Sequence, residues 1–168
     1  MTTRSPIWKR ALRRVCRREE RGQALVEFAF MMPFVLLFML ILIDFGIGLN
    51  HRVVVTGAAR EGVRYGATGA TELEIKDRTI GHSEGLVTDP GDVTVEFFDT
   101  NGDGDLLPGD AVAVRINYSY QLVTELDSVA TAFGATIDTS FEMNACTDMR
   151  LEQVWSGATI TSGASPCE

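Results

Sequence analysis

The sequence predicts an α+β protein in which a long N-terminal transmembrane helix continues into a small globular domain with a three- to four-stranded antiparallel sheet. Two observations support this prediction: a charge-free apolar run from Phe28 to Ile43, and three later segments that alternate apolar and polar residues. We therefore expect a basic leader over residues 1–22, a transmembrane helix over 23–50 and an α+β domain over 51–168.

The apolar run is long enough to cross a membrane. A helix needs about 20 mostly apolar residues to span the hydrocarbon core, and residues 24–49 provide them if Glu27 and Asp44 lie near the two ends. A helix buried in a soluble protein would normally show a polar face, which this run lacks. A cleaved secretory signal is the other alternative, but Asp44 and the helical pattern after it disfavour a cleavage site there.

Charge divides the chain into two parts of opposite sign. Residues 1–22 hold eight basic and two acidic residues, whereas residues 23–168 hold seven basic and 21 acidic residues. The acidic body argues against nucleic-acid binding, which requires a basic surface. The positive-inside rule places the leader in the cytoplasm and the acidic domain outside. We therefore expect a single-pass membrane protein with an extracytoplasmic C-terminal domain.

The helical pattern continues beyond the membrane segment. Small residues recur on one face at steps of three and four: Ala58, Ala59, Gly62, Val63 and Gly66. Two glycines four residues apart allow another backbone to approach closely, either from another protein or from the same domain, and packing within the domain is favoured. A ragged apolar pattern over 72–86 predicts a second, shorter helix, so the helical region ends at about residue 86.

Three strands are expected after a turn at residues 89–92. Residues 93–98 and 111–122 are rich in β-branched residues and alternate, and residues 136–154 form the third strand. The apolar faces of the second and third strands are Val112, Val114, Ile116, Tyr118 and Tyr120, and Ile137, Thr139, Phe141 and Met143. Three antiparallel strands packed on a helix can bury a modest core.

The loop between the first two strands has the spacing of a calcium-binding loop and resembles the dockerin type. In DTNGDGDLLPGD, residues 99–110, oxygen-bearing side chains alternate along the chain and Gly104 allows a sharp turn. The candidate Ca²⁺ ligands are Asp99, Asn101, Asp103, Asp105 and Asp110. The Asn-Gly and Asp-Gly pairs also suit a plain polar hairpin. Repulsion among the four aspartates favours a structural Ca²⁺ ion.

Two of the three cysteines lie in the acidic domain. Cys16 belongs to the leader, whereas Cys146 lies in the last expected strand and Cys167 near the end of the chain. Because disulfides persist outside the cytoplasm, we expect a bond between Cys146 and Cys167 that holds the tail on the last strand. Two free thiols, or a bond to another protein, are the alternatives.

The start of the apolar run carries a processing motif. Gly22 precedes the run, Gln23 comes directly after this glycine, and Glu27 lies five residues after it. This arrangement resembles type IV prepilins, in which a membrane-embedded peptidase cuts after the glycine and leaves the helix on the mature protein. The resemblance implies cleavage between Gly22 and Gln23 and pairing of Glu27 with the N-terminal amine of a neighbouring subunit. A carboxylate in hydrocarbon costs at least ~2.5 kcal/mol, so it is retained only with a partner or a use; an ordinary Glu at the membrane edge is the alternative.

Further motifs follow in a fixed order: Arg21-Gly22, Pro33, Asp44-Phe45-Gly46, Ala58-Ala59-Arg60-Glu61-Gly62 and Arg64-Tyr65-Gly66-Ala67. Their order and spacing resemble the TadE-like family, small pilin-like proteins of tight-adherence (Flp-type) pilus systems. Gly66 departs from that pattern, in which Ala is more usual.

The resemblance implies a membrane-anchored minor pilin or pseudopilin that acts in pilus assembly. Its expected partners are a prepilin peptidase, other pilin-like subunits and the assembly platform. The alternative is a membrane-anchored extracellular domain that binds calcium or an adhesive ligand and never joins a pilus. The sequence shows no nucleophile–base set, phosphate-binding loop or catalytic metal cluster, so we do not expect an enzyme.

Overall fold

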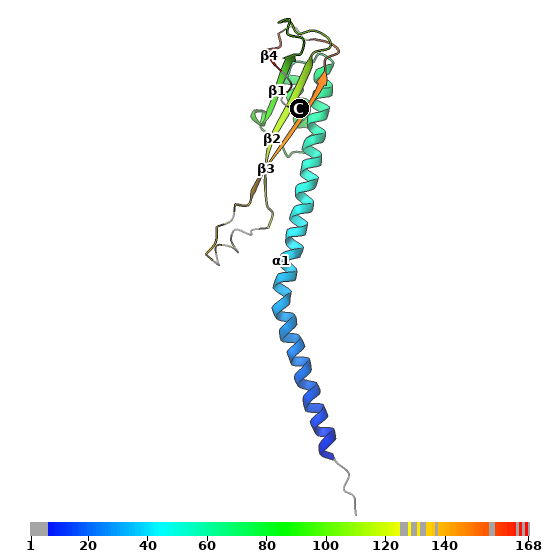
Figure 1. Cartoon of the computed structure of the whole chain (residues 1–168), viewed down its shortest axis with the longest axis vertical. Helices are drawn as coiled ribbons and strands as arrows, with labels where there is room; N and C mark the ends of the chain where they lie inside the picture. The colour runs from blue at the N-terminus through cyan, green and yellow to red at the C-terminus, as the bar shows by residue number, and fades with distance from the viewer. Residues whose placement is uncertain are drawn as a thin grey trace, which may run out of the picture. The chain divides into compact units, whose positions relative to one another are not determined.

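The computed structural model (Figure 1) describes residues 7–124, 128, 131, 134–136, 138–154, 157–163, 165 and 167, and its account of side chains leaves out residues 7–21 and 162. The chain divides into two compact units, residues 1–43 and 44–168. The elements in chain order are helix α1 (Ile7–Ala67), helix α2 (Glu72–Gly81), the 3-10 turn η1 (Pro90–Asp92) and the strands β1 (Val93–Asp99), β2 (Ala111–Gln121), β3 (Ser140–Arg150) and β4 (Ile160–Ser162).

The first unit consists of the N-terminal part of α1. Every side chain from Gly22 to Ile43 is exposed, although most are large and apolar. Helix α1 is long and apolar enough over its 22–67 part to cross a membrane. A core helix of a soluble protein would be buried, so the exposure of this run disfavours that alternative. An N-terminal apolar helix of this kind is consistent with a single-pass membrane anchor.

The second unit is an α+β domain built on a four-stranded sheet of order β3-β2-β1-β4. Strand β2 pairs antiparallel with both of its neighbours. Its Ile116 lies opposite Val93 of β1, and its Ala111 lies opposite Arg150 of β3. The C-terminal part of α1 lies along one face of this sheet (Figure 1). The α+β fold class predicted from the sequence is confirmed.

The sheet is mixed, so the expectation of a purely antiparallel sheet is wrong. Strand β4 pairs in parallel with the end of β1, from Phe97↔Ile160 to Asp99↔Ser162. The end of β3 lies at the same end of the sheet, because Arg150 pairs with Ala111. Strands β1 and β3 both run antiparallel to β2 and end at this same end of the sheet. Strand β4 follows β3 there and runs in the same direction as β3, so it is parallel to β1.

The third strand is shorter than the expected range 136–154. Strand β3 ends at Arg150, and the next side chain, Leu151, turns into the core. There the backbone of Leu151 exchanges hydrogen bonds with Gly109 and Asp110, and Glu152 N donates to the carbonyl of Ala67 over 2.8 Å. The chain leaves the ladder at this point because its backbone groups find partners in the loop and at the end of α1.

The core lies between α1, α2 and the sheet. Its fully buried members come from all three: Val55, Ala58, Ala59, Val63, Ile75, Val112, Val114 and Ile116. The alternating apolar face expected of the second strand points into this core, with Tyr120 also buried. On β3 the same face is buried only at Ala145, and Phe141 is exposed; Ile137 lies outside the described residues.

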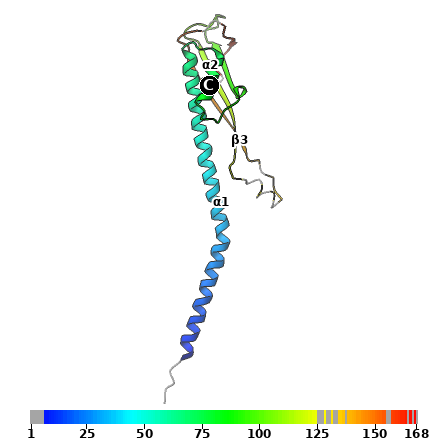
Figure 2. The ribbon, with the colours of Figure 1, turned by 180° about the vertical axis from the view of Figure 1, so that it is seen from behind.

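The small-residue face of α1 packs within its own domain. A Cβ atom added to Gly62 would lie 2.0 Å from Oγ1 of Thr79 on α2, and one added to Gly66 would lie 2.9 Å from Cδ1 of Ile75. Both glycines are buried. The Gly62-x-x-x-Gly66 motif therefore lets α2 and the sheet approach α1 closely and does not offer a free surface to another helix. Figure 2 shows α1, α2 and the sheet from behind.

An ion-pair group on the surface also joins α2 to α1. Glu61 accepts from Arg64 on its own helix over 2.8 Å and from Arg78 on α2 over 2.9 Å. These hydrogen bonds, first that of Arg64 and then that of Arg78, lower the pKa of Glu61 to about 2. Glu61 is therefore ionised at neutral pH and holds both guanidinium groups.

Candidate functional site

The residues of the processing motif lie at the exposed start of the described apolar helix. Gly22 has no heavy atom within 4 Å of the position that a Cβ would take, and Glu27 is exposed. Neighbouring apolar side chains are equally open, with Leu25 69 % and Phe28 62 % exposed. Within the described residues Glu27 has no ion-pair partner in its own chain.

Asp44 forms a buried site that the sequence did not reveal. It is 2 % exposed, and its carboxylate accepts hydrogen bonds from Val123 N (3.0 Å) and from Thr124 N (3.2 Å) and the Thr124 hydroxyl. The hydroxyl of Tyr120 donates to the carbonyl oxygen of Asp44 over 3.3 Å. Asp44 thus fixes the end of β2 and the segment after it to the helix. From the sequence, Asp44 is expected only to lie near the end of the membrane segment.

Aromatic side chains fill the space next to Asp44. The ring of His51 meets the rings of Tyr118 and Tyr120 edge-on, with centroids 5.8 and 5.1 Å apart, and His51 Nδ1 lies 3.0 Å from the Tyr118 hydroxyl. A Cβ added to Gly48 would lie 3.5 Å from the Tyr120 ring, so the glycine lets that ring approach α1. Burial raises the pKa of both tyrosines, so both hydroxyls stay protonated at neutral pH, and that of Tyr120 donates to Asp44. The cluster is a packing contact between helix and sheet.

The 99–110 loop is held by hydrogen bonds to its own aspartates. Asp99 accepts from the backbone N–H groups of Asn101, Gly102 and Gly104, the last over 2.8 Å. Asp110 accepts from Leu107 N over 2.7 Å and from Thr100, and these bonds, that of Leu107 foremost, lower its pKa. Gly104 has a φ of 85°, so the sharp turn expected at this glycine is present.

The predicted calcium ligands are not gathered around one point. In the part of the chain that the structure describes, no group of three or more His, Cys, Asp or Glu side chains is placed to hold a metal ion. Asn101 and Asp103 instead accept from the backbone two residues on, over 3.1 and 3.0 Å. Calcium binding by this loop stays a prediction from the spacing of its residues.

We expect about 5 mM Ca²⁺ to stabilise the domain by about 1–2 kcal/mol, if its affinity is that of extracellular calcium modules, ~10⁻⁴ to 10⁻³ M. The physical reason is that a cation relieves repulsion among the four aspartates. Thermal unfolding followed by circular dichroism, with Ca²⁺ and with EDTA, measures the effect. The control is the Asp103→Asn, Asp105→Asn double variant, which keeps Asp99 and Asp110 as acceptors of the loop's backbone N–H groups. Its melting temperature should not change with Ca²⁺. Equal melting temperatures of the unaltered protein with Ca²⁺ and with EDTA would contradict calcium binding.

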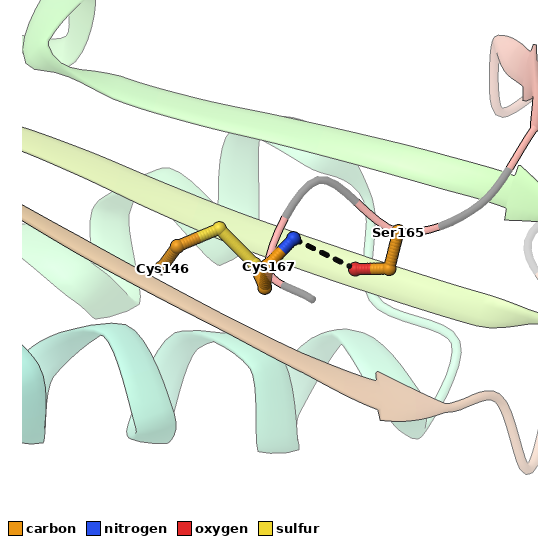
Figure 3. The surroundings of a disulfide bond; sticks show 3 residues. All are labelled: Cys146, Ser165 and Cys167. Atoms are coloured by element: carbon orange, nitrogen blue, oxygen red, sulfur yellow. Dashed lines mark hydrogen bonds between the residues drawn. A yellow bond between two sulfur atoms is a disulfide. The ribbon is translucent and has the colours of Figure 1, made fainter.

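Cys146 and Cys167 form the predicted disulfide (Figure 3). Their Cα atoms are 5.3 Å apart and 21 positions separate them in the sequence, a loop whose closure stabilises a protein by about 3 kcal/mol in the chain-entropy model. Cys167 packs on the side of the sheet opposite α1, against Phe98, Ala111 and Ala113. The bond therefore holds the C-terminal tail over an apolar patch of the sheet.

An exposed apolar helix that continues into a small α+β domain fits the class of pilin-like, membrane-anchored proteins. Within this class, residues 22–64 match the model of the TadE-like protein family. The match begins at Gly22 and contains Glu27 and Asp44. The resemblance to the TadE-like family inferred from the motifs is thereby confirmed over this segment. No curated protein and no solved structure matches the chain.

Proposed function

We propose that this chain is a TadE-like minor pilin or pseudopilin, a structural component in the assembly of a tight-adherence pilus. The observation that carries the proposal is the exposed apolar part of α1 that follows Gly22 and contains Glu27, which lies within the family match over 22–64. A surface of this size and apolar character needs lipid or other apolar helices around it. The helix of a pilin-like subunit is surrounded by lipid while it is in the membrane and by the helices of other subunits once it is in the fibre.

The proposal gives Glu27 a role in assembly. Its carboxylate has no ion-pair partner among the described residues and stands between large apolar side chains. An unpaired carboxylate in such surroundings is costly, and a cation supplied by another subunit would offset this cost. The amine of Gln23, freed by cleavage after Gly22, supplies such a cation. Because a buried charge pair tolerates little displacement, the pair would also fix the register between neighbouring helices.

A prepilin peptidase, other pilin-like subunits and the assembly platform are the proposed partners. Cleavage after Gly22 removes the basic leader, whose charge keeps the N-terminus in the cytoplasm and directs the acidic domain outside. The chain is then a substrate of the peptidase and a building block, and not a catalyst. The TadE-like match supports this reading, since the family is structural and pilin-like.

The N-terminal residue and intact mass of the membrane protein test the proposal. With the peptidase present, the recovered chain should begin at Gln23; without it, or with Gly22→Leu, the chain should begin at Met1. Gly46→Leu is the matched control, because Gly46 also lies on α1 with no heavy atom within 4 Å of an added Cβ. A chain that begins at Met1 beside an active peptidase would reduce the proposal to a plain anchored domain, and a chain that begins after Asp44 would identify a secreted protein.

The second candidate is an anchored extracellular domain that binds calcium or an adhesive ligand outside any pilus. The spacing of the oxygen-bearing side chains in the 99–110 loop, at Asp99, Asn101 and Asp103, favours it. The two candidates differ at Glu27. Replacing Glu27 by Gln should abolish incorporation into a pilus in the first case, and should leave membrane anchoring and calcium binding unchanged in the second.

A further inference from the structure

The residue that follows the apolar run marks one boundary of the proposed membrane span. From Gln23 to Ile43 a helix rises about 30 Å, the thickness of the hydrocarbon core. Asp44 comes next in the same helix and is the first ionisable residue after Glu27. Given the membrane anchor proposed above, on which this inference rests, Asp44 lies at the outer edge of the hydrocarbon.

Asp44 holds a segment from far along the chain at this same level. Its carboxylate accepts the N–H groups of Val123 and Thr124, about 80 positions later in the sequence, at 3.0 and 3.2 Å. The Tyr120 hydroxyl binds the carbonyl of the same aspartate. Because three hydrogen-bonded residues fix the end of β2 to Asp44, residues 122–124 must lie near the outer surface of the membrane.

Two exposed side chains next to Asp44 are large and apolar. Val123 is 66 % exposed and Phe45, the neighbour of Asp44, is 65 % exposed. Residues 45–51 and 121–124 contain no Asp, Glu, Lys or Arg, whereas residues 44–168 as a whole contain 20 acidic and seven basic residues. Asp44, which directly precedes the first of these segments, is buried and hydrogen-bonded. Among the described residues next to Asp44, Phe45 and Val123 thus present exposed apolar side chains at the level where the helix leaves the proposed membrane span.

We infer that Val123 and Phe45 form a second membrane contact, in which this end of the domain rests on the boundary between the lipid headgroups and the acyl chains. Apolar side chains gain free energy on insertion at that depth, and the helix already holds them there. Asp44 is then the residue that positions the contact. The domain would be held against the membrane by two segments distant in sequence, which restricts its tilt while the subunit waits for assembly.

Depth-dependent fluorescence quenching on the full chain tests the contact. The protein carries Cys16→Ser, keeps its disulfide, and receives one labelled cysteine at a time in phosphatidylcholine vesicles. Val123→Cys reports the proposed contact. Leu73→Cys on α2 is the matched control, since Leu73 is 68 % exposed and far in sequence from the span, and Phe38→Cys reports insertion of the helix. Quenchers are aqueous iodide and lipids with a nitroxide at the headgroup or deep in the acyl chain.

We expect iodide to quench the label at Val123 several-fold less than the label at Leu73, and the headgroup nitroxide to quench Val123 strongly. Equal quenching of Val123 and Leu73 by both agents would overturn the membrane contact. Protection of Val123 from iodide without any quenching by lipid nitroxides would also overturn it, since another copy of the chain would then cover the residue. If the deep nitroxide quenches the label at Phe38 but the label at Val123 gives either of these contrary results, the membrane anchor stands and only this inference falls. If Phe38 is not quenched, the anchor and the inference fall together.

Discussion

Replacing Asp44 by Ala is expected to lower the free energy of unfolding of the 44–168 domain by about 2–4 kcal/mol, because three donors lose their shared acceptor. These donors are the N–H groups of Val123 and Thr124 and the Thr124 hydroxyl, and Asp44 is 2 % exposed. Asp44→Asn should cost nearly as much, since its amide nitrogen would face a donor where a carboxylate oxygen now accepts. Urea unfolding of the full chain in detergent micelles, followed by circular dichroism, measures both changes.

The Asn variant separates two roles for this residue. If Asp44 were only a charged group at the membrane edge, Asp44→Asn would be neutral or stabilising, because removing a charge near hydrocarbon is favourable. That result would contradict the role of Asp44 as the hydrogen-bond acceptor for Val123 and Thr124. Asp77→Asn on α2 is the control: Asp77 is exposed, and surface substitutions of this kind usually change stability by less than about 0.5 kcal/mol.

Asp44 also shows where the sequence stops being informative. Its position at the end of the apolar run is visible in the sequence, but its partners lie about 80 positions away in a segment without a motif. A local pattern cannot report such a contact, because it depends on how β2 packs against α1. An aspartate set among apolar residues, Ile43 and Phe45, was the available signal, since a carboxylate there requires a partner.

The same limit applies to the fold. Helix α1 and strands β1 and β2 follow from periodic patterns of apolar residues, and the sequence predicts them because one buried face repeats over many residues. Strand β4 has three residues, too few to show alternation, and its parallel pairing depends on where β3 ends. The pattern of apolar residues in the sequence therefore does not predict the mixed sheet.

Among the candidate site residues, the sequence was most informative where spacing along the chain carries the chemistry. Gly22 and Glu27 are five residues apart on one helix, so the family pattern includes both. The disulfide was predictable from compartment and cysteine count, and its path over Phe98 and Ala111 was not. In the 99–110 loop the spacing is right for calcium, but the carboxylates bind backbone N–H groups, which the spacing alone does not exclude.

Replacing Gly62 by Ala is expected to destabilise the domain by about 1–3 kcal/mol, the usual cost of overpacking a well-packed core. The added Cβ would lie 2.0 Å from Oγ1 of Thr79. Thr79 is fully buried and its hydroxyl donates to the carbonyl of Ile75 over 2.8 Å, so moving it breaks that bond or separates α2 from α1. Urea unfolding of the full chain in micelles gives the change in free energy.

Gly57→Ala is the matched control, since Gly57 lies on the same helix and no heavy atom is within 4 Å of an added Cβ. There Ala should stabilise the domain by about 0.5–1 kcal/mol, because it favours an exposed helix over Gly. The two substitutions are chemically identical and five residues apart, so opposite signs can come only from what each glycine touches. If Gly62→Ala stabilised the domain as Gly57→Ala does, the packing of α2 against α1 would be wrong, and the Gly62-x-x-x-Gly66 face would become available to another helix.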